Sequence, residues 1–259
     1  MKSKTIFKQI LICLACTVAY FVCTYPLRDT FAVFTVTDVR PGAALNPFLS
    51  ICFGPAASLG CSIATLIADY LSGYPTKVLI QGFPLQFIYG FIPFLVWKKI
   101  TKGDNHSYRI DSSSKFLKFT LIAFLFGILS GVGVAYIVYS NFGANFFETI
   151  AFVFMNNFTF TMLFGFPLMI CANIVISGIG KEERRKLSVR EYVIIFTSVA
   201  EFLGIAVITY ATYMIYSNAN AGTYDIWNNI FFYSVIYVNL MIVATIVVLK
   251  FIEKRKRHN

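Results

Sequence analysis

Long, uninterrupted runs of apolar residues constrain this chain more than any other feature of its sequence. Several runs reach about 20 residues, the length at which a helix crosses the hydrocarbon core of a bilayer. They do not show the one-sided apolar stripe of period 3.6 that marks the helices of a soluble domain. Hydrophobic residues make up 58% of the 259 residues and charged residues only 13%, which excludes an ordinary soluble protein. We therefore predict an all-α, polytopic membrane protein.

Eight apolar segments follow one another along the chain, and two of them are short. Their approximate ranges are 6–26, 43–54, 56–72, 79–97, 116–139, 147–176, 191–216 and 227–251. Gly54 and Pro55 predict a tight break between the second and third segments, because neither residue favours the interior of a helix. Residues 43–72 then form either a re-entrant hairpin or two short spans. No small-residue cleavage site follows the first segment, which predicts a retained anchor rather than a signal peptide.

The distribution of lysine and arginine predicts the orientation of the segments. With a cytoplasmic N-terminus, 19 of the 22 basic residues fall in the first few residues, the 98–118 loop, the 181–190 loop and the C-terminal tail. Arg28, Arg40 and Lys77 are the exceptions. The positive-inside rule thus predicts a multi-pass protein of the cell membrane with both termini cytoplasmic. The net charge of +10 fits this topology and an anionic inner leaflet, so we predict no nucleic-acid partner.

Polar side chains that can recognise a small molecule gather at the predicted outer ends of the segments. Charged groups inside a membrane often mark ligand sites, and polar groups that converge between aromatic walls suit a pocket. The candidates for substrate binding are Arg40, Asn46, Asp69, Tyr74, Glu148 and Asn156. Two simpler interpretations stay open, a structural ion pair between Arg40 and Asp69, and a merely hydrated outer surface.

Small residues recur at a spacing of four on three segments. They are Ala15 and Ala19 on the first, Gly60, Ala64 and Ala68 on the third, and Ala123, Gly127, Gly131 and Ala135 on the fifth. Small side chains let helix backbones approach closely, which drives helix association in lipid. For the third and fifth segments we predict packing inside the bundle.

The chain resembles the substrate-binding S components of energy-coupling factor (ECF) vitamin transporters. The resemblance rests on the pair Ala15 and Ala19, the long outer loop that follows it, and the hairpin V-R-P…A-L-x-P…G-P…A-D from Val39 to Asp69, within six spans. It implies that a vitamin-like or other small heterocyclic solute enters an outward pocket. It also implies that Ala15 and Ala19 dock on a transmembrane coupling subunit, which works with ATPase subunits.

The C-terminal part departs from this pattern, because S components typically have six spans. We predict a six-helix, S-component-like core over 1–177, with the short-helix hairpin at 43–72. Residues 178–259 are predicted to add two transmembrane helices and a basic cytoplasmic tail. Glu201, a carboxylate inside the seventh segment, is either a proton site or a hydrogen-bonding group between helices.

Enzymatic functions find little support in the sequence. The two histidines, His106 and His258, lie in polar loops, and motifs for metalloproteases or serine hydrolases are missing. We predict no catalytic residues, no metal and no cofactor. Since there is no Walker motif, an ATPase has to come from another chain if this chain takes part in active transport. Two alternatives remain, a membrane sensor or receptor domain that uses the same pocket, and a proton-coupled secondary carrier that uses Glu201.

Overall fold

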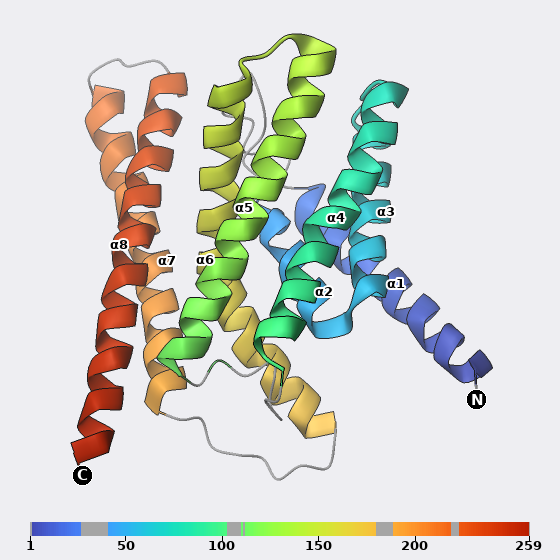
Figure 1. The fold of residues 1–259 in the computed structure, drawn as a ribbon. Coiled ribbons are helices and arrows are strands. Elements are labelled where there is room, and N and C mark those ends of the chain that lie inside the picture. Colours follow the sequence, from blue (N-terminus) through green and yellow to red (C-terminus); the bar gives the residue numbers. More distant parts are fainter. Residues whose placement is uncertain are drawn as a thin grey trace. The chain divides into compact units, whose positions relative to one another are not determined.

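The computed structural model describes residues 2–26, 41–102, 110, 112–179, 189–218 and 223–258. Every regular element in these ranges is helical, which confirms the predicted fold class (Figure 1). The elements are α1 (Lys2–Thr24), the 3-10 turn η2 (Pro41–Ala44), α2 (Leu45–Phe53), α3 (Pro55–Leu71), α4 (Thr76–Ile100), α5 (Ser113–Phe142), α6 (Phe146–Ile179), α7 (Val189–Asn218) and α8 (Thr223–His258).

Four stretches of these helices are long and apolar enough to cross a membrane. They are Thr5–Thr24, Thr76–Ile100, Ser113–Phe142 and Phe146–Met169. The apolar stretches in α2, α3, α7 and α8 are shorter. The arrangement of six spans plus two therefore stays a prediction.

The chain divides into two compact units. Unit 1 consists of Met1–Ser107 and Leu121–Thr161, and unit 2 consists of Tyr108–Thr120 and Met162–Asn259. Unit 1 holds α1 to α4 together with most of α5 and the first half of α6. Unit 2 holds the beginning of α5, the rest of α6, and α7 and α8.

The break between α2 and α3 is a single residue, as the sequence predicts. Gly54 has a φ of 78°, a backbone conformation that favours glycine, and its N–H donates to the carbonyl of Ser50 at 2.8 Å. Pro55 begins α3 at the first helical position, where the missing N–H would have no partner anyway. With nine residues, α2 is about 13 Å long, too short to cross a bilayer.

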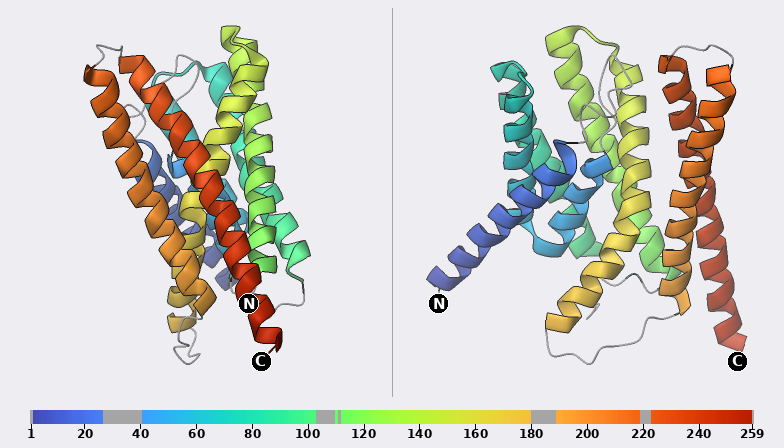
Figure 2. Two further views of the ribbon diagram at one scale, coloured as in Figure 1. Left: turned by 90° about the vertical axis from the view of Figure 1, so that its left-hand side faces the viewer. Right: turned by 180° about the vertical axis from the view of Figure 1, so that it is seen from behind.

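One face of α1 packs against α3 in unit 1. Cys16 and Tyr20 are buried there, and the Thr17 hydroxyl lies 3.1 Å from the carbonyl oxygen of Gly60. A β-carbon at Gly60 would overlap the Cys13 carbonyl oxygen, so the small residue is what allows this close approach. The first half of α1 extends away from the other helices of the unit (Figure 2).

Glycines on α5 allow the first half of α6 to approach closely in the same way. β-Carbons at Gly127 and Gly131 would lie 2.9 Å from the Phe154 side chain and 3.1 Å from the Ile150 carbonyl oxygen, respectively. Asn157 Nδ2 donates to Ser130 Oγ at 2.8 Å across this contact. The predicted internal packing of the third and fifth segments is confirmed, since all their spaced small residues are buried.

In unit 2, α7 and α8 pack against each other as a helical hairpin. The Tyr237 hydroxyl donates to the Ala200 carbonyl at 2.8 Å, and its ring lies against Gly204. Glu201, the residue that follows Ala200 in α7, is 4% exposed.

Candidate solute-binding site

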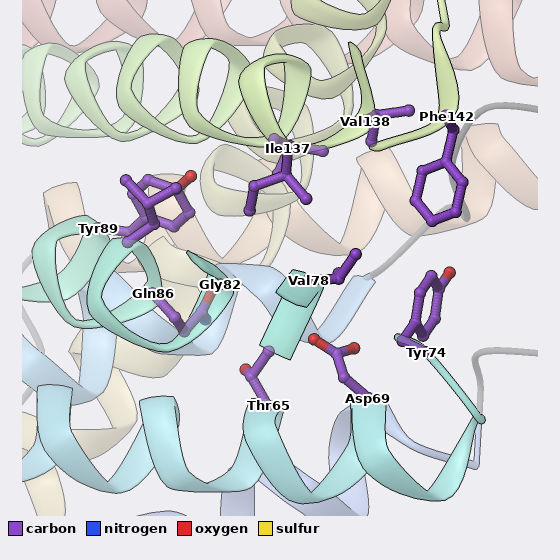
Figure 3. Close-up of a pocket in the computed structure, with 12 residues that line it drawn as sticks. Thr65, Asp69, Tyr74, Val78, Gly82, Gln86, Tyr89, Ile137, Val138 and Phe142 are labelled. Carbon is purple, nitrogen blue, oxygen red and sulfur yellow. The ribbon is translucent and has the colours of Figure 1, made fainter. Parts of the chain in front are cut away.

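A pocket of about 100 Å³ lies in unit 1 between α3, α4 and the second half of α5 (Figure 3). Drug-sized ligands occupy pockets of about 300–1,000 Å³, so this one suits a small solute. It is lined by Thr65, Asp69, Tyr74, Val78, Gly82, Leu85, Gln86, Tyr89, Val134, Ile137, Val138 and Phe142. Most of the lining is apolar, and the few polar groups come from α3, α4 and the turn between them.

Asp69 is the acidic residue of the pocket. It lies near the end of α3 and is only 9% exposed, although burial of a carboxylate in an apolar environment is unfavourable. Gly82 of α4 lies next to this carboxylate: a β-carbon at residue 82 would lie 3.9 Å from Asp69 Oδ2. The missing side chain at residue 82 leaves room next to the carboxylate.

A glycine turn at the end of α3 brings Tyr74 back to the pocket. Gly73 has a φ of 75°, the Tyr74 N–H donates to the Asp69 carbonyl at 3.1 Å, and the Gly73 N–H donates to the Tyr70 carbonyl at 3.0 Å. This pair of hydrogen bonds is the Schellman motif that commonly ends helices. The same turn therefore ends α3 just after Asp69 and places an aromatic wall beside it.

Aromatic side chains stand at both ends of the pocket. Tyr74 and Phe142 lie at one end and Tyr89 lies at the other (Figure 3). Tyr89 is 4% exposed, and its ring packs edge-to-face on Phe126 with 6.5 Å between the centroids. Its hydroxyl is buried without a hydrogen-bond partner.

Gln86 of α4 connects the pocket wall to two neighbouring helices. Its Nε2 donates to the Tyr20 hydroxyl of α1 at 2.9 Å, and its backbone carbonyl accepts from Asn46 Nδ2 of α2 at 2.9 Å. Asn46 in turn accepts from Ser50 Oγ at 3.2 Å, and Ser50 accepts from Ser58 Oγ at 2.8 Å. This buried polar cluster supports α4 from behind the pocket.

The structure brings two of the six predicted substrate-binding residues, Asp69 and Tyr74, into the pocket. Asn46 lies behind its wall in the polar cluster. Glu148 is exposed in the first turn of α6, and Asn156 is buried beside Asn157; neither lines the pocket. Arg40 lies outside the described residues. The suggested ion pair between Arg40 and Asp69 therefore stays a prediction.

The other ten lining residues were not predicted from the sequence, and four of them, Thr65, Gly82, Gln86 and Tyr89, shape the pocket around Asp69. Thr65 precedes Asp69 by one helical turn, so the spacing i, i+4 on one face was available as a signal. Gln86 is an amide inside an apolar segment, which is unusual enough to be noticed. Nothing in the sequence distinguishes Gly82 or Tyr89 from other glycines and tyrosines of the spans.

The docking residues predicted on α1 lie on its free face. Ala15 and Ala19 are exposed. Their neighbours Cys16 and Tyr20 are buried, Cys16 against Gly60 of α3 and Tyr20 against Gln86 of α4. The large exposed side chains on the same helix include Leu11, Leu14, Val18 and Val22.

Apolar helices long enough to span a bilayer, with a small, mostly apolar pocket that holds a few polar groups, define a multi-pass membrane protein that handles a small solute. A sequence profile described as QueT transporter matches residues 11–173, which is more than half of the chain. The chain belongs to the QueT transporter family, whose members are ECF-type S components that transport queuosine precursors. The resemblance to S components is thereby confirmed. No curated protein and no solved structure matches the chain.

Proposed function

We propose that this chain binds a queuosine precursor from the outer face of the cell membrane, in the pocket around Asp69. Queuosine is a 7-deazaguanine nucleoside, so its precursor bases are planar and carry a ring N–H next to an exocyclic amine. A carboxylate accepts hydrogen bonds from two such neighbouring donors at once. The observation that carries the proposal is a nearly buried carboxylate, in a small pocket with aromatic ends, inside the family-matched region.

The other pocket groups have complementary roles in this proposal. Tyr74 and Phe142 stand at the end that the distribution of basic residues assigns to the outside, so they flank the entrance. The apolar side chains of α5 cover one face of the planar base. Gly82 leaves space for the base to approach the carboxylate. Arg40 is proposed to hold a carbonyl of the solute, as a guanidinium does well and a lysine does not.

ATP-driven delivery into the cell requires partners, because this chain has no ATPase motif. We propose a transmembrane coupling subunit and ATPase subunits of an ECF module, with Ala15 and Ala19 at the contact. Their exposure on the face of α1 opposite to α3 supports this role. We further propose that 1–177 is the S-component core, and that α7 and α8 are an addition beyond the matched residues.

Glu201 supports a second candidate mechanism, proton-coupled transport. It is a buried carboxylate in α7, where an ionised group is costly and a protonated one is not. Uptake that follows a pH gradient without ATP, and that is lost in Glu201→Gln, would favour this mechanism over an ECF module. We rank it second because the family match supports an S component.

The binding proposal is tested by isothermal titration calorimetry of the detergent-purified full chain with 7-deazaguanine. Asp69→Asn keeps the shape of the side chain but removes its charge and one acceptor. A hydrogen bond to a charged group contributes about 1.5–3 kcal/mol, so we expect affinity to fall about 10- to 150-fold. The matched control is Glu148→Gln, an exposed acidic residue outside the pocket, which should bind like the wild type. Equal affinities of Asp69→Asn and wild type would exclude the proposed site.

A further inference from the structure

We propose that Gly82 of α4 selects the solute by size, because the exocyclic amine of the base occupies the space where any other residue would have its side chain. The proposal rests on the proposed function, since it concerns the same pocket and the same base. It adds a specificity-determining residue and names the part of the solute that this residue faces.

The space next to Gly82 is open towards the pocket. Gly82 and Asp69 line the pocket from two different helices, α4 and α3 (Figure 3). A β-carbon at residue 82 would have one atom of another residue within 4 Å, Asp69 Oδ2 at 3.9 Å. This is an ordinary van der Waals distance, so the protein itself has room for a side chain there. The space therefore belongs to the volume that a solute can fill.

Other helical glycines show what a glycine required for packing looks like. In the described part of unit 1, a β-carbon at each of five further glycines within α-helices would come to 3.1 Å or less from an atom of another helix. They are Gly60, Gly90, Gly127, Gly131 and Gly133. Small residues of this kind allow helices to approach closely in lipid. Gly82 has no such contact, so close helix packing does not explain it.

The backbone does not require a glycine at residue 82 either. The positive φ values among the described glycines belong to Gly54, Gly73 and Gly143, which follow the ends of helices. Gly82 lies inside α4, where glycine is less favourable than alanine because it loses more conformational freedom. The competing explanation is a bend of α4 at Pro84, two residues later, since prolines inside helices cause kinks.

The exocyclic amine is the part of the base that matches this space. In the proposed function, the ring N–H and the amine of 7-deazaguanine both donate to the Asp69 carboxylate. The amine projects beyond the outline of the ring, whereas the ring nitrogen lies within it. A group that projects by one heavy atom fills the place of a methyl group next to Asp69 Oδ2. A methyl group at residue 82 and the amine of the base therefore compete for the same space.

Thermal unfolding of the purified full chain without solute distinguishes this role from a structural one. Gly82→Ala should leave the unfolding temperature unchanged or raise it by up to about 4 °C, because alanine is the better helix former and meets no clash. A glycine that is needed for the bend at Pro84 would be costly to replace. A clear fall of the unfolding temperature in Gly82→Ala would overturn the proposal.

Binding of 7-deazaguanine is measured by isothermal titration calorimetry. Gly82→Ala should weaken binding about 10- to 200-fold, the range for one methylene group too many in a closely fitting site. Gly82→Val fills more of the space and should bind more weakly still. The control is Ile80→Ala, which introduces alanine into the same helix at an exposed side chain outside the pocket. Its affinity should stay within about threefold of the wild type.

A second base tests whether the methyl group meets the amine itself. 7-Deazahypoxanthine keeps the ring N–H but lacks the exocyclic amine, so it leaves the space next to residue 82 empty. Gly82→Ala should therefore weaken its binding by less than about threefold. A methyl group that only displaced the Asp69 carboxylate would weaken both bases equally, because both donate their ring N–H to it. Equal losses for the two bases would overturn the placement of the amine.

The outcomes separate a failure of the proposed function from a failure of this inference. No binding of 7-deazaguanine by the wild type overturns both. Binding by the wild type that Gly82→Ala leaves unchanged, that it weakens equally for both bases, or that it weakens only together with a loss of stability overturns the role of Gly82 alone. A stable Gly82→Ala variant with a large loss for 7-deazaguanine and a small one for 7-deazahypoxanthine supports it.

Discussion

The hydroxyl of Tyr89 lies directly against Gly133, and a β-carbon on residue 133 would overlap it. This contact joins α4 to α5 at the inner end of the pocket. The same hydroxyl has no hydrogen-bond partner, so the pocket floor combines tight packing with an unsatisfied polar atom. The tight packing at Gly133 and the unsatisfied hydroxyl of Tyr89 lead to separate predictions.

Gly133→Ala should destabilise the protein. The added methyl group has to push Tyr89 away, and overpacking of this kind typically costs about 1–3 kcal/mol. Thermal unfolding of the detergent-purified chain measures the loss. Gly82→Ala is the matched control on α4, because its β-carbon would meet Asp69 Oδ2 at an ordinary 3.9 Å. A Gly133→Ala variant as stable as Gly82→Ala would contradict the close contact.

Tyr89→Phe should leave thermal stability unchanged or raise it slightly. The substitution removes a buried hydroxyl that has no partner and keeps the ring on Phe126. Tyr20→Phe is the informative comparison, because the Tyr20 hydroxyl accepts from Gln86 and its loss should lower the unfolding temperature. A clear loss of stability in Tyr89→Phe would show that the hydroxyl is satisfied after all.

Ala15→Trp should keep the fold and abolish binding to a coupling subunit. Ala15 is exposed on α1, so a bulky side chain fits in the isolated protein but prevents close helix contact with a partner. Co-purification with co-expressed ECF subunits measures docking, and calorimetry with 7-deazaguanine measures the pocket. Cys16→Trp, on the face packed against α3, should instead prevent folding. If Ala15→Trp also prevents folding, the alanine face packs internally.

Single cysteines in a cysteine-free background test the topology derived from the basic residues. An impermeant maleimide applied to intact cells should label cysteines at Asn141 and Asn218, at the ends of α5 and α7. A cysteine at Ser114, an exposed position at the beginning of α5, should react only after the membrane is opened. Labelling of the Ser114→Cys variant from outside would contradict the proposed orientation.

The sequence was sufficient for the helices and for part of the pocket. Apolar runs predict the ends of α1 to α8 to within about four residues, because length and hydropathy define such helices. The exception is the end of α8, which was predicted at residue 251 and continues through the basic residues to His258. Asp69 and Tyr74 were predictable because charged and aromatic groups at the ends of apolar segments are distinctive.

The remaining pocket residues depend on neighbours that the sequence does not reveal. Asn46 has the residue type of a ligand-binding group, but its amide is engaged by the Gln86 carbonyl and Ser50. The Gln86 side chain is held by the Tyr20 hydroxyl, 66 positions away in the sequence. Such roles arise from tertiary packing between helices, and residue type alone does not encode them.

The central claim, that this chain is the solute-binding component of an ECF system for a queuosine precursor, is tested most directly by uptake. Proteoliposomes that contain the chain together with ECF coupling and ATPase subunits would be loaded with ATP and supplied with radiolabelled precursor base. We expect ATP-dependent accumulation with the wild type, and little with Asp69→Asn or with the ATPase inactivated. Accumulation that is independent of ATP and of the ECF subunits, or that Asp69→Asn leaves unchanged, would contradict it.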